Sequence, residues 1–157
     1  MDEIDCRILE ELQVNCRIKV KELARKIGKP ITTIYARIRR LEEQGYIKAY
    51  KAMLNPQKFG LETLAFVFVS FTYGTERRMD QREVLRKIAS FPEVQEAHII
   101  TGDWDILLKV RVKNVEELGK FIVDKLRTVE GVEKTLTSVV LDTAKESYEI
   151  PLRCSER

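Results

Sequence analysis

The chain has 157 residues, of which 44% are hydrophobic and 34% charged, and its formal net charge at pH 7 is +3. This length suits one ordinary domain or two small ones. No apolar run approaches the ~18 residues that cross a bilayer, and the acidic start MDEIDCRILEELQ differs from a secretory signal, which is basic and then apolar. We therefore expect a soluble, cytoplasmic protein with no membrane partner. Its three cysteines lack CxxC spacing, which predicts free, mostly buried thiols rather than a disulfide framework or a four-ligand zinc site.

Charge is distributed unevenly along the sequence. Residues 1–16 carry one base and five acids, whereas residues 17–51 carry eleven bases and three acids. Residues 52–157 are nearly neutral, with sixteen bases and seventeen acids. A strongly basic segment beside a neutral one indicates a module that binds a polyanion, joined to a module with another role.

Three short helices are predicted in the N-terminal part of the chain. DEIDCRILEELQ has apolar side chains at helical spacing, and Asp2 is placed to cap its first turn. VKELARKIG repeats the pattern and ends at Gly28. Pro30 opens PITTIYARIRRLEEQG, which Gly45 ends. The joint between the second and third helices is short and contains a glycine, which is typical of a helix-turn-helix.

The third helix has two distinct faces. Ile34, Ile38 and Leu41 share the inward face, while the outward face carries hydroxyls near the helix start, a small residue in the middle and three arginines. That pattern suits a recognition helix in the major groove of double-stranded DNA, whereas a merely solvated helix usually intersperses glutamates with its arginines. After Gly45, YIKAYKAMLNP predicts a short strand that forms a wing against phosphates. The predicted DNA-binding residues are Thr32, Thr33, Tyr35, Ala36, Arg37, Arg39, Arg40 and Lys48.

The second half of the chain changes from helical to strand-like periodicity. LETLAFVFVSFTY, VQEAHIIT, DILLKVRV and VEKTLTSVVLDTAK predict four strands, and TERRMDQREVLRKIASFPE and NVEELGKFIVDKLRTVEG predict two helices. The order β-α-β-β-α-β is that of a ferredoxin-like domain, with an antiparallel sheet and both helices on one face. The expected fold class is therefore α+β: a winged helix-turn-helix domain over residues 1–54, a linker over 55–60, and a ferredoxin-like βαββαβ domain over 61–157.

The stretch TGDWD, residues 101–105, places two carboxylates around the only tryptophan and just after the only histidine, His98. From the residues alone it is a catalytic pair, a metal site, or a hairpin turn whose aspartates bind local backbone amides. No second histidine or nearby cysteine completes a metal site, and the sequence has neither a combination of nucleophile and base nor a glycine-rich phosphate loop. We therefore predict no enzyme activity, no catalytic residue, no metal and no cofactor.

Taken together, DEIDCRILEELQVNCR, VKELARKIG, TTIYARIRRLEEQGYI and TGDWDILLKVRV resemble the Lrp/AsnC family of transcription regulators, the leucine-responsive or feast/famine regulators. The motifs occur in the same order and at matching separations over nearly the whole chain. Where family members commonly begin the third helix with serine, this chain has Pro30 and Ile31, and Thr32 and Thr33 are left as substitutes. The resemblance implies a sequence-specific DNA-binding regulator that assembles through its second domain into dimers and octamers.

The resemblance also implies a small effector, an amino acid or a related compound, bound between dimers at the TGDWD turn. A carboxylate there would hold the α-ammonium group, and backbone amides would hold the α-carboxylate. Two interpretations compete with this one. The first is an architectural protein that organises DNA without effector control, and the second is an enzyme or metabolite-handling second domain with the helix-turn-helix as an accessory. The predicted effector-binding residues are His98, Thr101, Gly102, Asp103, Trp104, Asp105, Thr135, Thr137 and Ser138.

Overall fold

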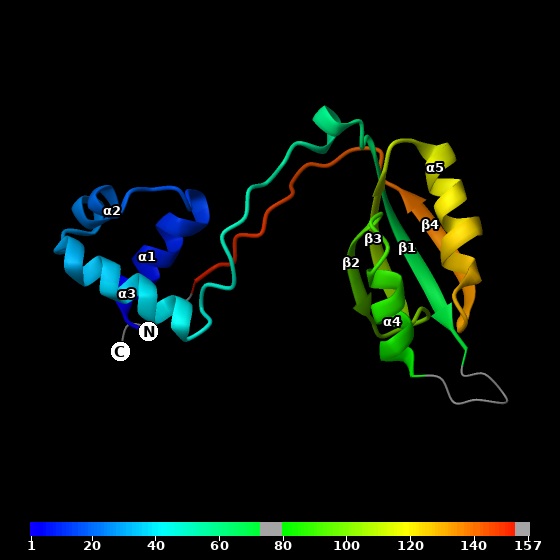
Figure 1. Cartoon of the computed structure of the whole chain (residues 1–157), viewed down its shortest axis with the longest axis horizontal. Helices are drawn as coiled ribbons and strands as arrows, with labels where there is room; N and C mark the ends of the chain where they lie inside the picture. Colours follow the sequence, from blue (N-terminus) through cyan, green and yellow to red (C-terminus); the bar gives the residue numbers. More distant parts are fainter. Residues whose placement is uncertain (73–79, 153–157) are drawn as a thin grey trace. The chain divides into compact units, whose positions relative to one another are not determined.

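The structure of the protein is a computed structural model, and it describes residues 1–72 and 80–152 (Figure 1). Contacts between residues divide the chain into two compact units. The first unit comprises Met1–Met53 together with the C-terminal residues from Lys145, and the second comprises Leu54–Ala144. The sequence-based division places the C-terminal stretch with the second domain instead, and this is where the two divisions differ most. No helix in the described part of the chain is long and apolar enough to cross a membrane.

Three helices build the first unit: α1 (Glu3–Val14), α2 (Val20–Ile27) and α3 (Ile31–Glu43). Gly28 ends α2, and Gly45 lies just beyond α3. Both glycines have a left-handed backbone, with φ of 74° and 75°, which other residues adopt only at a cost in free energy. The glycine after α2 allows the short turn into α3, and the predicted helix-turn-helix is confirmed.

The three helices of the first unit pack around one apolar core, which also receives the C-terminal stretch. The side chain of Gln13 donates to the carbonyl of Ile150 at 3.2 Å and accepts from its N–H at 2.8 Å. Leu152 packs against the same core. Full burial of an isoleucine or leucine side chain contributes roughly 1.5–3 kcal/mol to stability. The buried core residues are Ile8, Leu9, Leu23, Ala24, Ile27, Ile34 and Leu41.

The strand predicted after Gly45 does not form. The N–H groups of Tyr46 and Ile47 both donate to the carbonyl of Leu41, at 2.9 and 3.3 Å, so the backbone turns back on the end of α3. Residues 46–54 are irregular, and the described residues supply no strand for them to pair with. Without a paired neighbour, alternating apolar side chains alone do not stabilise a strand.

The cysteines depart from the expectation of free, buried thiols. Cys6 is buried, but it is disulfide-bonded. Cys16 is free, but it is exposed. Cys154 lies outside the described residues. Sequence spacing misleads here because a disulfide requires only that two cysteines approach in space.

The second unit is the predicted antiparallel sheet of four strands with two helices. Its strand order is β2-β3-β1-β4, which is ferredoxin-like and confirms the predicted fold class. The start of the first predicted helix, before Asp80, falls partly outside the described residues. The elements are β1 (Thr63–Phe71), α4 (Gln81–Ala89), β2 (Val94–Ile99), β3 (Ile106–Val112), α5 (Val115–Lys120) and β4 (Val132–Val139). Single turns complete them: 3₁₀ helix at Pro56–Phe59 and Leu126–Thr128, and π helix at Phe121–Lys125.

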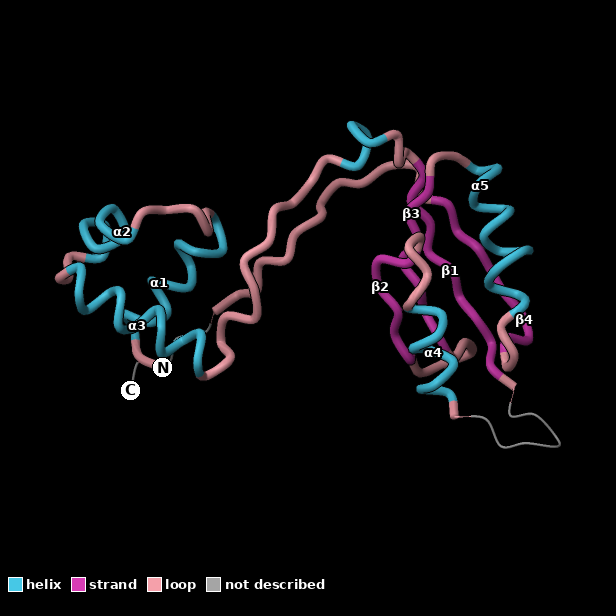
Figure 2. Tube along the Cα trace, viewed as in Figure 1, coloured by secondary structure: helices cyan, strands magenta, loops and turns pink. Residues whose placement is uncertain are grey.

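Both helices of the second unit cover one face of its sheet, and the other face is open. Figure 2 shows the strands of this unit with α4 and α5 beside them. On the open face, Phe68 of β1 lies opposite Leu107 of β3 and Leu136 of β4. Leu136 is 48% exposed, so this face leaves a large apolar side chain in contact with solvent. The helix-covered core includes Ala65, Val67, Val69, Val84, Ile88, Leu118 and Phe121.

Candidate nucleic-acid interface and a second polar site

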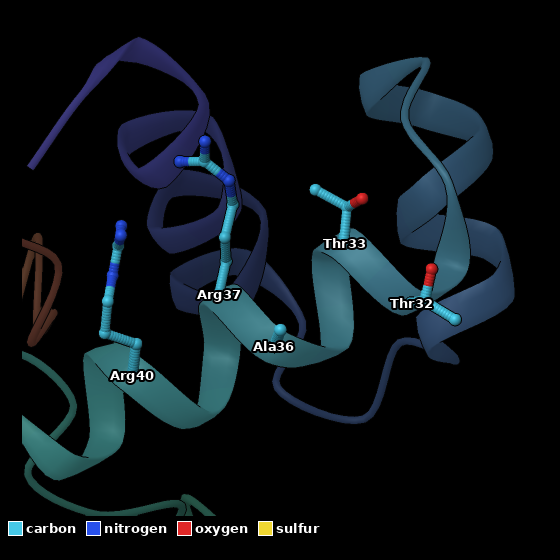
Figure 3. Close-up of a pocket in the computed structure, with 5 residues that line it drawn as sticks. All are labelled: Thr32, Thr33, Ala36, Arg37 and Arg40. Carbon is cyan, nitrogen blue, oxygen red and sulfur yellow. The ribbon is translucent and has the colours of Figure 1, made fainter.

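The outward face of α3 forms a shallow pocket that collects five of the eight predicted DNA-binding residues (Figure 3). The hydroxyls of Thr32 and Thr33 lie at the start of the helix, and Arg37 and Arg40 extend from it further along. The other three predicted residues are exposed but do not line the pocket; they are Tyr35, Arg39 and Lys48. Ala36 completes the lining and leaves room between the threonines and the arginines.

Two of the three arginines of α3 are tied to carboxylates at the start of α1. Nη1 of Arg37 lies 2.6 Å from Oδ2 of Asp2 and 2.8 Å from Oδ1 of Asp5. Nη2 of Arg40 lies 2.7 Å from Oδ2 of Asp5. The sequence-based interpretation treated these arginines as free and missed the carboxylates. The available signal was the matched spacing, because D-x-x-D and R-x-x-R each place two side chains on one face of a helix.

Asp5 is an almost fully buried acid, with 1% of its side chain exposed. A carboxylate that leaves water is costly unless charges and hydrogen bonds replace the water. Two guanidinium groups do so here, together with the N–H of Asp2, which donates to Oδ2 at 3.0 Å. This cluster of Asp2, Asp5, Arg37 and Arg40, named the DR cluster below, therefore joins α1 to α3.

The DR cluster also changes the charge that α3 presents. The hydrogen bond from Arg37, helped by the N–H of Asp5, lowers the pKa of Asp2 to about 2. The hydrogen bonds to Asp2 and Asp5 raise the pKa of Arg37 above its ordinary value. Arg37 and Arg40 are thus compensated within the protein. Arg39 is exposed, and no ion pair joins it to any residue that the structure describes.

In the TGDWD loop, the second aspartate has a structural contact. Oδ2 of Asp105 accepts the N–H of Phe71 at 2.7 Å, beside the irregularity in register at the end of β1. The carbonyl of Asp105 accepts the N–H of Ile100 at 2.9 Å and closes the turn. Gly102 has φ of 116°, which favours glycine at this position. Asp103 is exposed, and within the described residues no hydrogen bond or ion pair of its side chain is found.

A pocket of the second unit lies beside this loop, against the edge strand β4. Nε and Nη2 of Arg127 donate to Oγ1 of Thr135 at 3.3 and 3.2 Å. The ring of Trp104 lies 6.2 Å from that of Phe68, centroid to centroid, and forms part of the wall. The pocket is lined by Trp104, Arg127, Val132, Glu133, Lys134, Thr135 and Leu136.

Only two of the nine predicted effector residues, Trp104 and Thr135, line this pocket. Thr101, Gly102 and Asp103 lie in the loop beside Trp104, while Thr137 and Ser138 lie further along β4. The basic residues Arg127 and Lys134 were missed. Nothing in their sequence context sets them apart from other surface bases.

His98 lies away from the pocket, on the open face of β2. Its Nε2 is 3.3 Å from Oε2 of Glu96, whose Oε1 is 3.3 Å from Nζ of Lys109. Partial burial acts to raise the pKa of Glu96, but the hydrogen bonds to His98 and Lys109 outweigh it and the pKa is lowered. In the described part of the chain, no group of three potential metal ligands is found.

A helix-turn-helix with a polar and basic outer face, followed by a ferredoxin-like domain with its own pocket, is typical of DNA-binding transcription regulators. The family model described as Lrp/AsnC ligand binding domain matches residues 64–150, and the one described as winged helix-turn-helix DNA-binding matches residues 1–48. The chain belongs to the Lrp/AsnC family of transcription regulators, which are not enzymes, and the resemblance drawn from the sequence is confirmed.

Similar proteins cover nearly the whole chain. An uncharacterized HTH-type transcriptional regulator of Pyrococcus abyssi is 44% identical over 146 residues, which are 93% of this chain and 96% of that one. The structure of a transcriptional regulator of Neisseria meningitidis in complex with L-Met has a TM-score of 0.90 and 29% identity, covering 96% of both chains. A feast or famine regulatory protein of M. tuberculosis complexed with L-methionine has a TM-score of 0.83 and 26% identity, covering 95% of this chain and 97% of that one.

Proposed function

We propose that this regulator recognises specific double-stranded DNA sequences through the outer face of α3, and that an amino acid bound in the second unit modulates its action. The observation that carries the first part is the pocket of Thr32, Thr33, Ala36, Arg37 and Arg40, which places donors and acceptors along one side of a helix. A helix of this kind fits the major groove, where base pairs are told apart by their donor and acceptor patterns. The proposed DNA-binding function supports a cytoplasmic protein, which is part of the proposal.

The start of α3 supports contact with phosphates. Pro30 is its N-cap and makes no side-chain capping bond, so the first N–H groups of the helix are left for another acceptor. Thr32 and Thr33 add hydroxyls beside them. Arg39 and Lys48 are exposed and supply positive charge for the backbone of the duplex. We therefore assign base recognition to Thr32, Thr33 and Ala36, and phosphate binding to the arginines of the helix and to Lys48.

Sequence specificity is tested by selection from a pool of random duplexes with the full-length protein. Specific recognition by paired helices predicts enriched duplexes with a shared half-site, repeated at about one helical turn of DNA. Thr33→Ala should alter the selected half-site, whereas Lys113→Gln, in the loop after β3, should leave it unchanged. Tight binding without any shared half-site would instead favour the architectural DNA organiser.

The chemistry of the pocket beside Trp104 supports an amino-acid effector. Arg127 and Lys134 offer cations for an α-carboxylate, and Glu133 offers an anion for an α-ammonium group. Trp104 and Leu136 form an apolar wall for a side chain. The two solved relatives whose names include L-methionine support this class of ligand. Asp103 and the other predicted loop residues remain part of the proposed site.

Thermal unfolding of the protein with each of the twenty amino acids tests the effector. A ligand that binds only the folded state stabilises it by RT ln(1 + L/Kd), where L is the free ligand concentration, so the melting temperature rises with the logarithm of the ligand concentration once that concentration exceeds Kd. Arg127→Gln should abolish the response, and Asp103→Ala should weaken it, while Lys113→Gln should respond like the wild type. No response to any amino acid would remove effector control from the proposal.

Assembly into dimers, and of dimers into octamers, is proposed to use the open face of the sheet. Phe68, Leu107 and Leu136 meet there, and Leu136 is half exposed. Apolar side chains gathered on an exposed sheet face favour association with a second copy. Leu136→Glu should lower the mass measured by light scattering, and an unchanged mass would place the interface elsewhere.

A further inference from the structure

Arg37 is held by two carboxylates that differ greatly in exposure. Its Nη1 lies 2.7 and 2.6 Å from the two oxygens of Asp2 and 2.8 Å from Oδ1 of Asp5. The side chain of Asp5 is 1% exposed, whereas that of Asp2 is 53% exposed. Asp5 is therefore part of the packed structure, while Asp2 forms a surface ion pair that another anion can reach.

The donor atom shared by these carboxylates has no capacity left. An Nη atom carries two N–H groups, and three carboxylate oxygens lie within 2.8 Å of this one. Carboxylate and phosphate oxygens bind guanidinium groups in similar geometry. A phosphate at Nη1 of Arg37 must therefore replace a carboxylate. Asp5 is buried and is also held by Arg40, so Asp2 is the one that can yield.

The two roles of the Asp2 side chain can be separated. Its Oδ1 accepts the N–H of Asp5 at 2.9 Å and caps α1, and that bond needs an oxygen but not a charge. Asparagine caps helices as well as aspartate does. Asp2→Asn therefore keeps the cap and removes the negative charge from Arg37.

We propose that Asp2 is an internal competitor for DNA phosphate at Arg37, and that it lowers both the affinity of α3 for DNA and the salt dependence of binding. This inference rests on the DNA-binding function proposed above. In the free protein the carboxylate of Asp2 occupies Nη1 of the guanidinium. On DNA a phosphate takes that place, and Asp2 remains as a negative charge beside the duplex. The competition in the free protein and the repulsion between Asp2 and the bound DNA both oppose binding, and both disappear when Asp2 is neutral.

The test compares binding of the full-length protein to one duplex, taken from the selection above, over a series of salt concentrations. Asp2→Asn should bind about two- to fivefold tighter at low salt. Its plot of log affinity against log salt should be steeper by up to about 0.9 for each bound α3. Glu3→Gln is the matched control, because it removes the same charge from the next residue and no ion pair of Glu3 is found within the described residues.

Repeating the comparison in an Arg37→Gln background tests whether Asp2 acts through Arg37. In that background, Asp2→Asn should have no more effect than Glu3→Gln. Circular dichroism of each variant checks that the helices are intact. If Asp2→Asn and Glu3→Gln have the same affinity for DNA when Arg37 is present, Asp2 does not compete with phosphate. If Asp2→Asn binds DNA more weakly than the wild type, the proposal is also overturned, because Asp2 would then be positioning Arg37 for DNA. If the wild type shows no salt-dependent DNA binding, the proposed function fails, and this inference fails with it.

Discussion

The variant Asp5→Ala should destabilise the first unit by about 3 kcal/mol. Loss of one partner from a fully buried ion pair costs about 3–5 kcal/mol, but the arginines here can reach water. Arg37 is 21% exposed, and its bond to Asp5 accounts for about 1.5–2 kcal/mol. Arg40 is 48% exposed and accounts for about 0.5–1 kcal/mol. The capping bond that the Asp5 carboxylate accepts from the N–H of Asp2 adds about 0.5 kcal/mol.

Amide hydrogen exchange of the intact protein measures this loss where it occurs. Exchange of the buried amides of α1 and α3, at Ile8 and Leu41, reports the opening of the first unit. A loss of about 3 kcal/mol corresponds to roughly 150-fold faster exchange. Glu3→Gln should leave these rates nearly unchanged. If Asp5→Ala changes them by less than about threefold, the DR cluster does not join α1 to α3.

Two further predictions concern other contacts. Because the folded-state pKa of Asp2 is about 2, against about 3.9 in the unfolded chain, its charge stabilises the fold above pH ~4. That contribution is lost as pH falls toward 2. The urea midpoints of the wild type and Asp2→Asn, measured by helical circular dichroism, should therefore converge as the pH is lowered from about 4 toward 2. A difference that stays constant over this range would contradict the ion pair between Asp2 and Arg37. Asp105→Ala should cost about 1–2 kcal/mol, because it removes the acceptor of the Phe71 N–H. Trp104 fluorescence during urea unfolding measures this, with Asp103→Ala as the near-neutral control.

The fold follows from the sequence wherever a periodic pattern ends at a residue with a special backbone. Gly28 stops α2 at a positive φ, and alternation along β1 separates the helix-covered face from the open one. The prediction of a strand after Gly45 was wrong because strand pairing depends on a neighbouring strand that the local sequence does not specify. The return of the C-terminal stretch to the first unit rests on Gln13 and Leu152, which carry no such pattern.

The candidate sites were less predictable than the fold. Helical periodicity placed Arg37 and Arg40 on the outward face correctly, but it cannot show that Asp2 and Asp5, more than thirty residues earlier, compensate them. In the second unit, the TGDWD motif led to Trp104, whereas Arg127 enters the pocket only because β4 folds back beside the turn that ends the last helix. Long-range pairing of charged side chains is set by tertiary packing rather than by local pattern.

Binding of DNA by the outer face of α3 is tested most directly by the salt dependence of the affinity. Affinity of the wild type for the selected duplex should fall steeply with salt. Arg39→Gln should lower the slope of log affinity against log salt by about 0.9 for each bound α3, because Arg39 is exposed and no carboxylate in the described residues compensates it. Lys113→Gln, which removes the same charge from the second unit, should keep the wild-type slope. Equal slopes for all three proteins would contradict binding of DNA by this face.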